Sequence, residues 1–571
     1  MKRIMIIFLS AALAFSSCSK MFDVDSTGNL TGSKAAQMVE KEPEFLFSYV
    51  SGLYSWMVTP FTVYSGHDDG GFLLCNMLTD FMGQDIVLDG TENWGQFDYN
   101  FDYGMEQYVR TYQFWTQYYT LINNANTILD YIPAGEEPSS VQVRGYLGQA
   151  YAIRALSYMY LMLLYQDPVD ESGALRTDAP SVPLVYASRD GIPADVAYER
   201  QGRNAYSVVM EHIEYNIAES LKFLDGYVRT SKNEIDQSVA YGIAARYYLF
   251  VQKWAEAASA AEKAREGYDI MDRERLLGGF MNLGDNEFMW GFNHTTETQT
   301  TYVSFSSHMS NDCEGYAGLD QPGKLIDRSL YDRMSRTDWR RGLFNGPEGD
   351  PKASPSTPAA ARPYAARKFG YMDQWLQDYI YMRASEMVLI QAEAEARLGD
   401  GAKAAATLAT LMSRRDPSWS ASTVTAADVQ IQRRIELWGE GHGYYDIRRN
   451  GRGIDRSYEG TNHTPANRIK VPAHDNLWWF QLPLKEITEN DKIDESEQNS
   501  WSKETTDEDE SESKAASLAA QGQWCVRGGR EMSFGWLCDV RNGYDEKDFE
   551  IYDCGNGAVL LLPESCGEDQ S

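Results

Sequence analysis

Two long segments with helical periodicity constrain the fold of this chain more than any other feature. Residues 107–132 and 143–166 carry apolar side chains at steps of three and four residues. In the first segment, Leu121 and Ala125 fall on one face, which is typical of an amphipathic helix that buries that face. The second segment ends before Pro168, because proline cannot continue a helix. The sequence therefore predicts two long consecutive helices within a helical body.

The same periodicity recurs along much of the chain. Segments 237–251 and 254–267 are rich in alanine, whose small side chain lets two helices approach closely, as in antiparallel tetratricopeptide hairpins. The repeat signature is partial, and a generic helical array would have nearly the same architecture. The predicted fold class is mostly α, with a tetratricopeptide-like helical repeat scaffold. Further helices are expected at 43–56, 206–224, 379–398, 402–413 and 426–438.

Three long stretches depart from this pattern and are expected to form an irregular ligand-binding loop subdomain. They cover residues 59–104, 268–375 and 453–480, and they are rich in glycine, aspartate and aromatic residues. Only 286–292 within them has the composition of a short strand. Long segments without regular periodicity in a compact protein are usually functional, so ligand-contacting residues are expected here.

The N-terminus has the pattern of an export signal. Lys2 and Arg3 precede the apolar run 4–15, which is too short to span a bilayer and is followed by Ser16, Ser17 and Cys18. This pattern predicts a lipoprotein signal peptide over residues 1–17, with Cys18 as the lipidated first residue of the mature chain. An ordinary signal peptide with an incidental cysteine is the alternative. Residues 19–40 are polar and fit a tether between the lipid and the folded body.

The last seventy residues differ in composition from the rest. Residues 501–521 begin with an acidic run, which is typical of a solvated linker because like charges repel. Residues 522–571 are expected to form a small appended module, with β-structure suggested by glycine-containing turns between short apolar runs. Outside the cytosol its cysteines would pair as two disulfides, with three connectivities open. These cysteines are Cys525, Cys538, Cys554 and Cys566.

Charge and motif content exclude several classes of function. The chain has 52 basic and 83 acidic residues, a net charge of −31, and no basic stripe, so nucleic-acid binding is not expected. No GxSxG, HExxH or phosphate-cradling Gly/Lys loop is present, and no enzyme, cofactor or metal site is predicted. Asp68 and Asp69 beside His67 could hold a metal ion, but a solvated polar turn is the preferred interpretation.

Aromatic residues are abundant and interleave with polar residues in one loop. The chain has 36 Tyr, 22 Phe and 14 Trp. Sugar rings stack their C–H faces on aromatic rings, while their hydroxyls need amide or carboxylate partners. Residues 89–104 combine both kinds, and 290–320 supplies a second wall; Trp375 and Trp478 are more distant candidates. The alternative is that each ring closes a local core. The expected ligand-binding residues are Trp94, Phe97, Tyr99, Tyr103, Asn93, Asn100, Tyr302 and Tyr316.

Two charged motifs carry a family resemblance. Residues 379–399 read YIYMRASEMVLIQAEAEARLG, and residues 431–449 read IQRRIELWGEGHGYYDIRR. With the helices at 115–128 and 148–165 and the segment 481–499, they resemble the SusD/RagB family of surface glycan-binding lipoproteins. The resemblance covers about 18–500; Gly443 departs from the basic residue usual in the second motif, and the tail lies outside the family pattern.

The resemblance implies a location, a ligand and a partner. A SusD-like protein would be lipid-anchored through Cys18 to the outer membrane of a Gram-negative bacterium and face the outside of the cell. It would bind an oligosaccharide or another nutrient and deliver it to a SusC-like TonB-dependent transporter. A structural or adhesion lipoprotein that uses the helical array for protein contacts is the first alternative. A glycan-acting enzyme is the second.

The charged motifs themselves are interpreted as structural. Arg433 and Arg434 are expected to form ion pairs with carboxylates such as Glu436, Glu440 or Asp446. Such networks usually lock helices together and take no part in an active site.

Overall fold

The computed structural model describes residues 32–90, 94–319, 323–353 and 357–502, together with the backbone of strands 549–553 and 559–563. The expected lipidation site at Cys18, the linker 501–521 beyond residue 502 and the four C-terminal cysteines lie outside the described residues. Part of the expected tether is helical, because α2 (Gly32–Lys41) covers its residues 32–40. No helix in the described part is long and apolar enough to cross a membrane.

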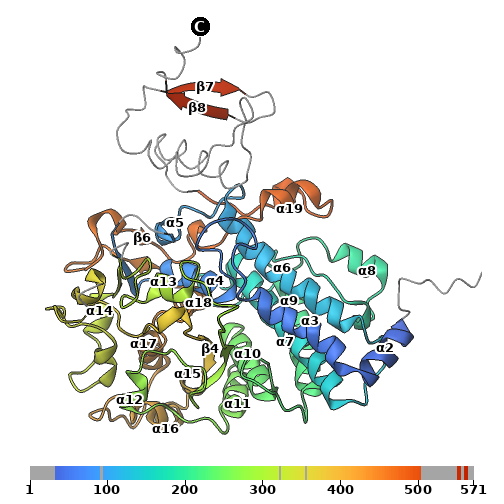
Figure 1. Cartoon of the computed structure of the whole chain (residues 1–571), viewed down its shortest axis with the longest axis horizontal. Helices are drawn as coiled ribbons and strands as arrows, with labels where there is room; N and C mark the ends of the chain where they lie inside the picture. Colours follow the sequence, from blue (N-terminus) through green and yellow to red (C-terminus); the bar gives the residue numbers. More distant parts are fainter. Residues whose placement is uncertain are drawn as a thin grey trace, which may run out of the picture.

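The described part is mostly helical, and its helices pack as a consecutive array, which confirms the tetratricopeptide-like scaffold (Figure 1). α7 packs between α6 and α9, α10 packs on α11, α11 on α15, and α15 on α16 and α17. In Figure 1, α6, α7 and α9 lie on the right and α15 to α17 on the left. The bounds are α6 Val109–Leu129, α7 Val141–Leu164, α9 Tyr206–Phe223, α10 Gln237–Phe250, α11 Trp254–Ala264, α15 Ala384–Arg397, α16 Gly401–Met412 and α17 Ala426–Glu436.

α7 is the central helix of the array, and its sequence explains its position. Every residue from Gly145 to Leu164 is buried, because α3 (Pro43–Trp56), α6, α9 and α10 pack around it. Glycine allows Tyr227 to approach the backbone of α7 closely, because a Cβ atom at Gly145 would lie only 2.1 Å from Cδ2 of Tyr227. The hydroxyl of Ser140 accepts a hydrogen bond from the Val143 amide and caps the start of the helix.

The first expected loop excursion, 59–104, contains a helix that periodicity did not predict. All residues of α4 (Phe72–Phe81) are buried, so the helix has no polar face and therefore no amphipathic pattern. The expectation of an irregular region was wrong for this segment. The same excursion also holds β1 (Ile86–Asp89) and the single turn α5 (Gln96–Tyr99).

Short antiparallel strand pairs join the first two excursions to each other and the second excursion to the segment that leads into α15. β1 pairs with β3 (Gly323–Ile326), and β2 (Phe288–Phe292) pairs with β4 (Tyr379–Arg383). The strand expected at 286–292 is therefore confirmed, whereas the helix expected at 379–398 begins only at Ala384, after β4. The remaining elements are α8 Ala194–Glu199, α12 Arg273–Leu276, α13 Phe305–Met309, α14 Arg328–Tyr331, α18 Gly443–Arg449, α19 Leu484–Glu489, β5 Ile454–Asp455 and β6 Lys470–Val471. Short 3-10 turns lie at Ser188–Asp190, Trp339–Leu343, Pro358–Ala361, Asp373–Trp375, Pro465–Asn467, Asn476–Trp478 and Glu495–Glu497.

The C-terminal module has a described β-hairpin. β7 (Phe549–Asp553) pairs antiparallel with β8 (Val559–Pro563), in a register that sets Phe549 opposite Pro563. The strands agree with the β-structure expected from the turn-rich sequence of this module. The expected disulfides fall on residues outside the described part of the chain.

A buried ion network ties the second half of the array together. Glu436, at the end of α17, contacts Arg340, Arg383 and Arg415, and all four side chains are at most 1% exposed. Burial opposes the ionisation of Glu436, yet the guanidinium groups of Arg415, Arg383 and Arg340 hold its pKa well below the usual range. The carboxylate is therefore charged at neutral pH.

The partners in this network are mostly not those expected from sequence proximity. Arg433 does pair with Asp446, with Nε 2.6 Å from Oδ2. Arg434, however, pairs with Asp85 instead of a carboxylate of its own motif. Glu440 pairs with Lys368 and Arg383. The structural interpretation of the motif holds, since these groups join separate segments; the pairs of Arg433 and Glu440 are largely buried, and Arg434 is about one-third exposed.

Replacing Glu440 tests the network. Burial raises the pKa of Glu440, but Arg383 and Lys368 outweigh it and lower the pKa to about 2. We expect Glu440→Gln to reduce the free energy of unfolding at neutral pH by about 3–5 kcal/mol, because Arg383 and Lys368 lose a buried partner. Since the folded-state pKa lies below the unfolded one, this contribution is present above about pH 4.5 and is lost as the pH falls towards about 2.

Chemical denaturation across this pH range measures both effects. Glu137→Gln, in the exposed pair with Lys222, is the matched control and should leave stability unchanged. Equal stability of Glu440→Gln and the wild type at neutral pH would contradict the role assigned to the network.

Candidate functional site

Aromatic side chains from separate excursions come together at one place on the surface. We call Phe61, His67, Trp94, Tyr302, Tyr316 and Trp375 the aromatic platform. The His67 ring lies nearly parallel to two of its neighbours, with centroids 5.5 Å from Trp94 and 6.3 Å from Tyr302. Tyr302 in turn lies 5.7 Å from Tyr316 and 6.4 Å from Trp375. Residues more than 300 positions apart in the sequence thus form one continuous group of rings.

Two residues of the platform are well exposed to solvent. Phe61 is 48% exposed and Tyr302 is 46% exposed, while the other four members are half-buried. Phe61 and Trp375 also have left-handed backbones, with φ of +57° and +59°. Such conformations cost about 1–3 kcal/mol for residues other than glycine, and they cluster at ligand-contacting positions. Phe61 combines this backbone with an exposed ring, whereas the Trp375 ring is half-buried.

Hydrogen bonds fix the centre of the platform. The His67 Nδ1 atom lies 2.6 Å from the Tyr316 hydroxyl, and the His308 Nε2 atom lies 2.9 Å from the His67 carbonyl oxygen. Partial burial lowers the pKa of His67 below its ordinary 6.5, and Asp68 opposes this shift. The imidazole is therefore neutral at pH 7 and contributes an uncharged aromatic face.

The turn that carries His67 is anchored from beneath. Asp68 is buried and forms an ion pair with Arg110 of α6, whose Nε atom also lies 2.6 Å from Asp98. Asp69 accepts hydrogen bonds from the Val63 and Tyr64 amides. The expectation of a solvated polar turn was therefore wrong: both carboxylates are buried and hold the loop in place. Among the described residues, no cluster of three or more His, Cys, Asp or Glu side chains could hold a metal ion.

The structure brings together only some of the residues expected to bind ligand. Trp94, Tyr302 and Tyr316 belong to the platform. Phe97 and Tyr103 stack on each other instead, with centroids 4.5 Å apart, and Tyr103 also lies 5.7 Å from the Arg110 guanidinium. Among the described residues, no aromatic ring pair joins Phe97 or Tyr103 to a member of the platform.

The other expected residues lie elsewhere. Tyr99 is fully buried, its hydroxyl is hydrogen-bonded to His463, and the Arg456 guanidinium lies 3.8 Å from its ring. It is therefore a core residue, and its assignment to the binding face was wrong. Asn100 is half-buried, and Asn93 lies outside the described residues. Trp478, a more distant candidate, is also buried.

Phe61 and His67 are platform residues that sequence reasoning missed. The flanking Pro60 and Gly66 mark turns, and the aromatic content of 59–67 was the available signal. The sequence indicates Trp375 only as a more distant candidate. Their convergence depends on tertiary contacts, such as the packing of Trp375 over Gly315, which spacing along the chain does not encode.

Two family models match this chain. One, described as starch-binding associating with outer membrane, matches residues 75–249, and the other, the SusD family, matches residues 372–514. Together they span more than half of the chain. The chain belongs to the SusD/RagB family. No curated protein sequence matches it.

Solved structures of SusD-like proteins share its fold. A SusD-like carbohydrate-binding protein from Bacteroides vulgatus is 21% identical, with a TM-score of 0.68, over 81% of this chain and 99% of its own. A SusD superfamily protein from Bacteroides thetaiotaomicron is 21% identical, with a TM-score of 0.64, over 80% and 99%. A laminarin-binding SusD-like protein is 18% identical, with a TM-score of 0.58, over 80% and 98%.

A substitution at Gly315 tests how tightly the platform is packed. A Cβ at this position would lie 2.6 Å from the Ser307 Cα and 2.9 Å from Cη2 of Trp375. We expect Gly315→Ala to displace Trp375 and to lower the free energy of unfolding by about 1–3 kcal/mol, because the site is overpacked. Chemical denaturation and a crystal structure of the variant measure these changes.

Gly52→Ala in α3 is the control. Apart from the neighbouring residues and the backbone of α3 itself, no atom lies within 4 Å of a Cβ at Gly52. The control should gain about 0.5–1 kcal/mol from helix propensity. Wild-type stability in Gly315→Ala, with Trp375 unmoved, would show that the platform is loosely packed.

Proposed function

We propose that this protein binds an extracellular glycan on the aromatic platform. The observation that carries the proposal is the convergence of six exposed or half-buried rings at one surface, with Phe61 and Trp375 on left-handed backbones. Flat aromatic faces suit the apolar C–H faces of sugar rings. A surface of several rings, and not one deep slot, suits a polymer that extends beyond the protein.

The related structures support the chemical class of this ligand. One of them is described as a carbohydrate-binding protein, one as laminarin-binding, and one as surface glycan-binding protein A from Bacteroides uniformis. At identities of 17–21% they share the fold, while the ligand of each is its own. The ring cluster of this chain is the independent observation that makes a glycan the preferred ligand here.

We propose that the protein binds the glycan and does not cleave it. A glycosidase needs two carboxyl groups that flank the bond to be cleaved. At the platform, Asp68 is committed to the buried pair with Arg110, and Asp69 to backbone amides of its own loop. Neither group is placed to act as an acid or a nucleophile on a ligand above the rings.

The proposed cellular setting is the outer membrane, with the chain held there by lipid on Cys18 and facing outward. The small-small-Cys junction after the apolar run supports this anchoring. We further propose that the captured glycan passes to a SusC-like TonB-dependent transporter. Tethering beside a transporter raises the effective concentration of ligand at its entrance, so modest affinity is sufficient.

Removing one exposed ring tests glycan capture. We expect Tyr302→Ala to weaken binding of the glycan that the wild type retains by about 1–3 kcal/mol, through the loss of stacking and of buried apolar area. Affinity electrophoresis in polysaccharide gels followed by calorimetry measures the change.

Tyr198→Ala is a matched control, because Tyr198 is 44% exposed and lies on α8, away from the platform residues in the chain. It should bind as the wild type does. Equal binding by Tyr302→Ala would remove the platform from the site.

The anchor is tested separately. We expect Cys18→Ala to release the protein from the membrane fraction, because multiple acyl chains at about 0.8 kcal/mol per buried CH2 supply the attachment. Fractionation of cells after a carbonate wash measures the distribution. Cys75→Ala is the control, since Cys75 is buried in the folded body. Retention of Cys18→Ala in the washed membranes would argue against lipidation at this residue.

A further inference from the structure

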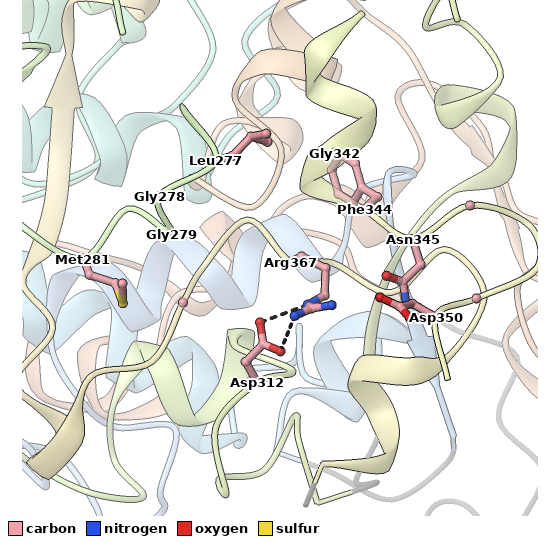
Figure 2. A pocket seen from close by; sticks show the side chains of 13 residues that line it. Leu277, Gly278, Gly279, Met281, Asp312, Gly342, Phe344, Asn345, Asp350 and Arg367 are labelled. Carbon is pink, nitrogen blue, oxygen red and sulfur yellow. Dashed lines mark hydrogen bonds and ion pairs between the residues drawn. The ribbon is translucent and has the colours of Figure 1, made fainter. Parts of the chain in front are cut away.

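A recess is lined by segments that neighbour the platform residues in the chain. It has a volume of about 630 Å³, within the range of small-molecule sites, and much of its wall is glycine (Figure 2). We call it the glycine pocket. Glycine is required at Gly279 and Gly349, which have φ of +92° and +68°, and a Cβ at Gly349 would lie 2.4 Å from the Ala361 carbonyl oxygen. The glycine residues that line it are Gly278, Gly279, Gly342, Gly346, Gly349 and Gly370.

The polar groups of the glycine pocket suit hydroxyl groups. Figure 2 shows Arg367 facing Asp312, with Asn345 and Asp350 nearby on the other side of Arg367. The Nε atom of Arg367 lies 3.0 Å from Oδ2 of Asp312, and Nη2 lies 2.9 Å from Oδ1. Both side chains remain about a quarter exposed, so each keeps donor or acceptor capacity for a ligand.

Apolar groups complete the lining. Leu277, which is 39% exposed, and Met281 line the same recess as the charged pair. A recess with a mainly polar lining and a few apolar side chains matches a sugar residue, which has both hydroxyls and C–H faces. Two carboxylates face one guanidinium here, and the chain carries a net charge of −31, so the pocket disfavours anionic groups such as uronates and sulfates.

Chain continuity places the glycine pocket beside the platform. Asp312 precedes the platform residue Tyr316 by four positions, a span of at most about 14 Å for an extended chain. Gly370 is followed by Tyr371, whose ring centroid lies 5.4 Å from that of Trp375. Two segments, 312–316 and 370–375, therefore contribute residues to both sites.

A small chamber adjoins the glycine pocket and shares Gly279, Met281 and Gly370 with it. Its volume is about 20 Å³, enough for one water molecule. The amide of Gln377, which is 4% exposed and lines this chamber, has no hydrogen-bond partner for either its oxygen or its nitrogen among the described residues. Buried amides of this kind are normally satisfied, so this one is available to a ligand hydroxyl through a bridging water.

We propose that the glycine pocket is a second carbohydrate subsite, which takes a neutral, multiply hydroxylated sugar residue of the glycan that lies on the aromatic platform. This inference rests on the proposed function. It adds a prediction about the ligand: affinity rises with chain length once an oligosaccharide reaches from the rings to Arg367, and neutral glycans bind in preference to acidic ones.

The experiment uses the full chain and a defined set of probes. Affinity gels containing laminarin, amylopectin, mannan or xylan provide neutral polysaccharides, and polygalacturonate and chondroitin sulfate provide acidic ones. Oligosaccharides of increasing length from the retained polysaccharide are then titrated by calorimetry. We expect Arg367→Ala to weaken binding of the longer oligosaccharides by about tenfold or more, through lost charge-assisted hydrogen bonds, and to leave the shortest binding oligosaccharide unaffected.

Arg434→Ala is the matched control. Its side chain is 32% exposed and paired with Asp85, and it does not line the pocket. The control should bind at every length as the wild type does, and denaturation midpoints of both variants verify folding.

The outcomes separate this inference from the proposed function. If Tyr302→Ala loses binding while Arg367→Ala matches the wild type at every length, the glycine pocket is not a subsite and the platform stands. A preference for the acidic polysaccharides, or an equal loss at all lengths in Arg367→Ala, also overturns the inference. If the wild type is retained by none of the polysaccharides, the proposed function fails together with it.

Discussion

The buried carboxylate of Glu436 is the interaction on which the second half of the structure depends. Arg340, Arg383 and Arg415 converge on it from the 3-10 turn Trp339–Leu343, the end of β4 and the turn that follows α16. Each charge would be costly alone in the interior, so the set is stable only when all members are in place. The network therefore couples the ends of separate elements and fixes the frame from which the long excursions emerge.

A fixed frame allows irregular loops to hold a defined surface. The loop with His67 is held by the buried pair between Asp68 and Arg110, and Arg110 belongs to the long helix α6. The rings above it are therefore positioned by the scaffold and not by the loop alone. The proposed binding residues thus lie on the loop excursions, and the helical array holds these loops in place, as is common in proteins whose binding residues lie on loops.

Local patterns predicted much of the scaffold, and non-local contacts set the rest. The helix expected at 43–56 has those bounds, because its amphipathic pattern and initial proline are local signals. α4 escaped prediction because burial on all sides removes periodicity. The ion-pair partners could not be predicted from local sequence either, because Arg434 pairs with Asp85, which lies almost 350 residues away in the chain. For the site, sequence reasoning reached Trp94 and Tyr302 through loop composition, but nothing local separates them from the buried Tyr99.

The left-handed backbones at Phe61 and Trp375 restrict how this surface can diversify. Glycine or asparagine would relax the main chain there, but either one would delete a ring. A β-branched residue would keep some apolar area at a higher conformational cost. Exchange of one aromatic side chain for another is therefore the substitution that these two positions accept most readily during evolution. Such an exchange alters the size and polarity of the binding surface and leaves the main-chain path intact.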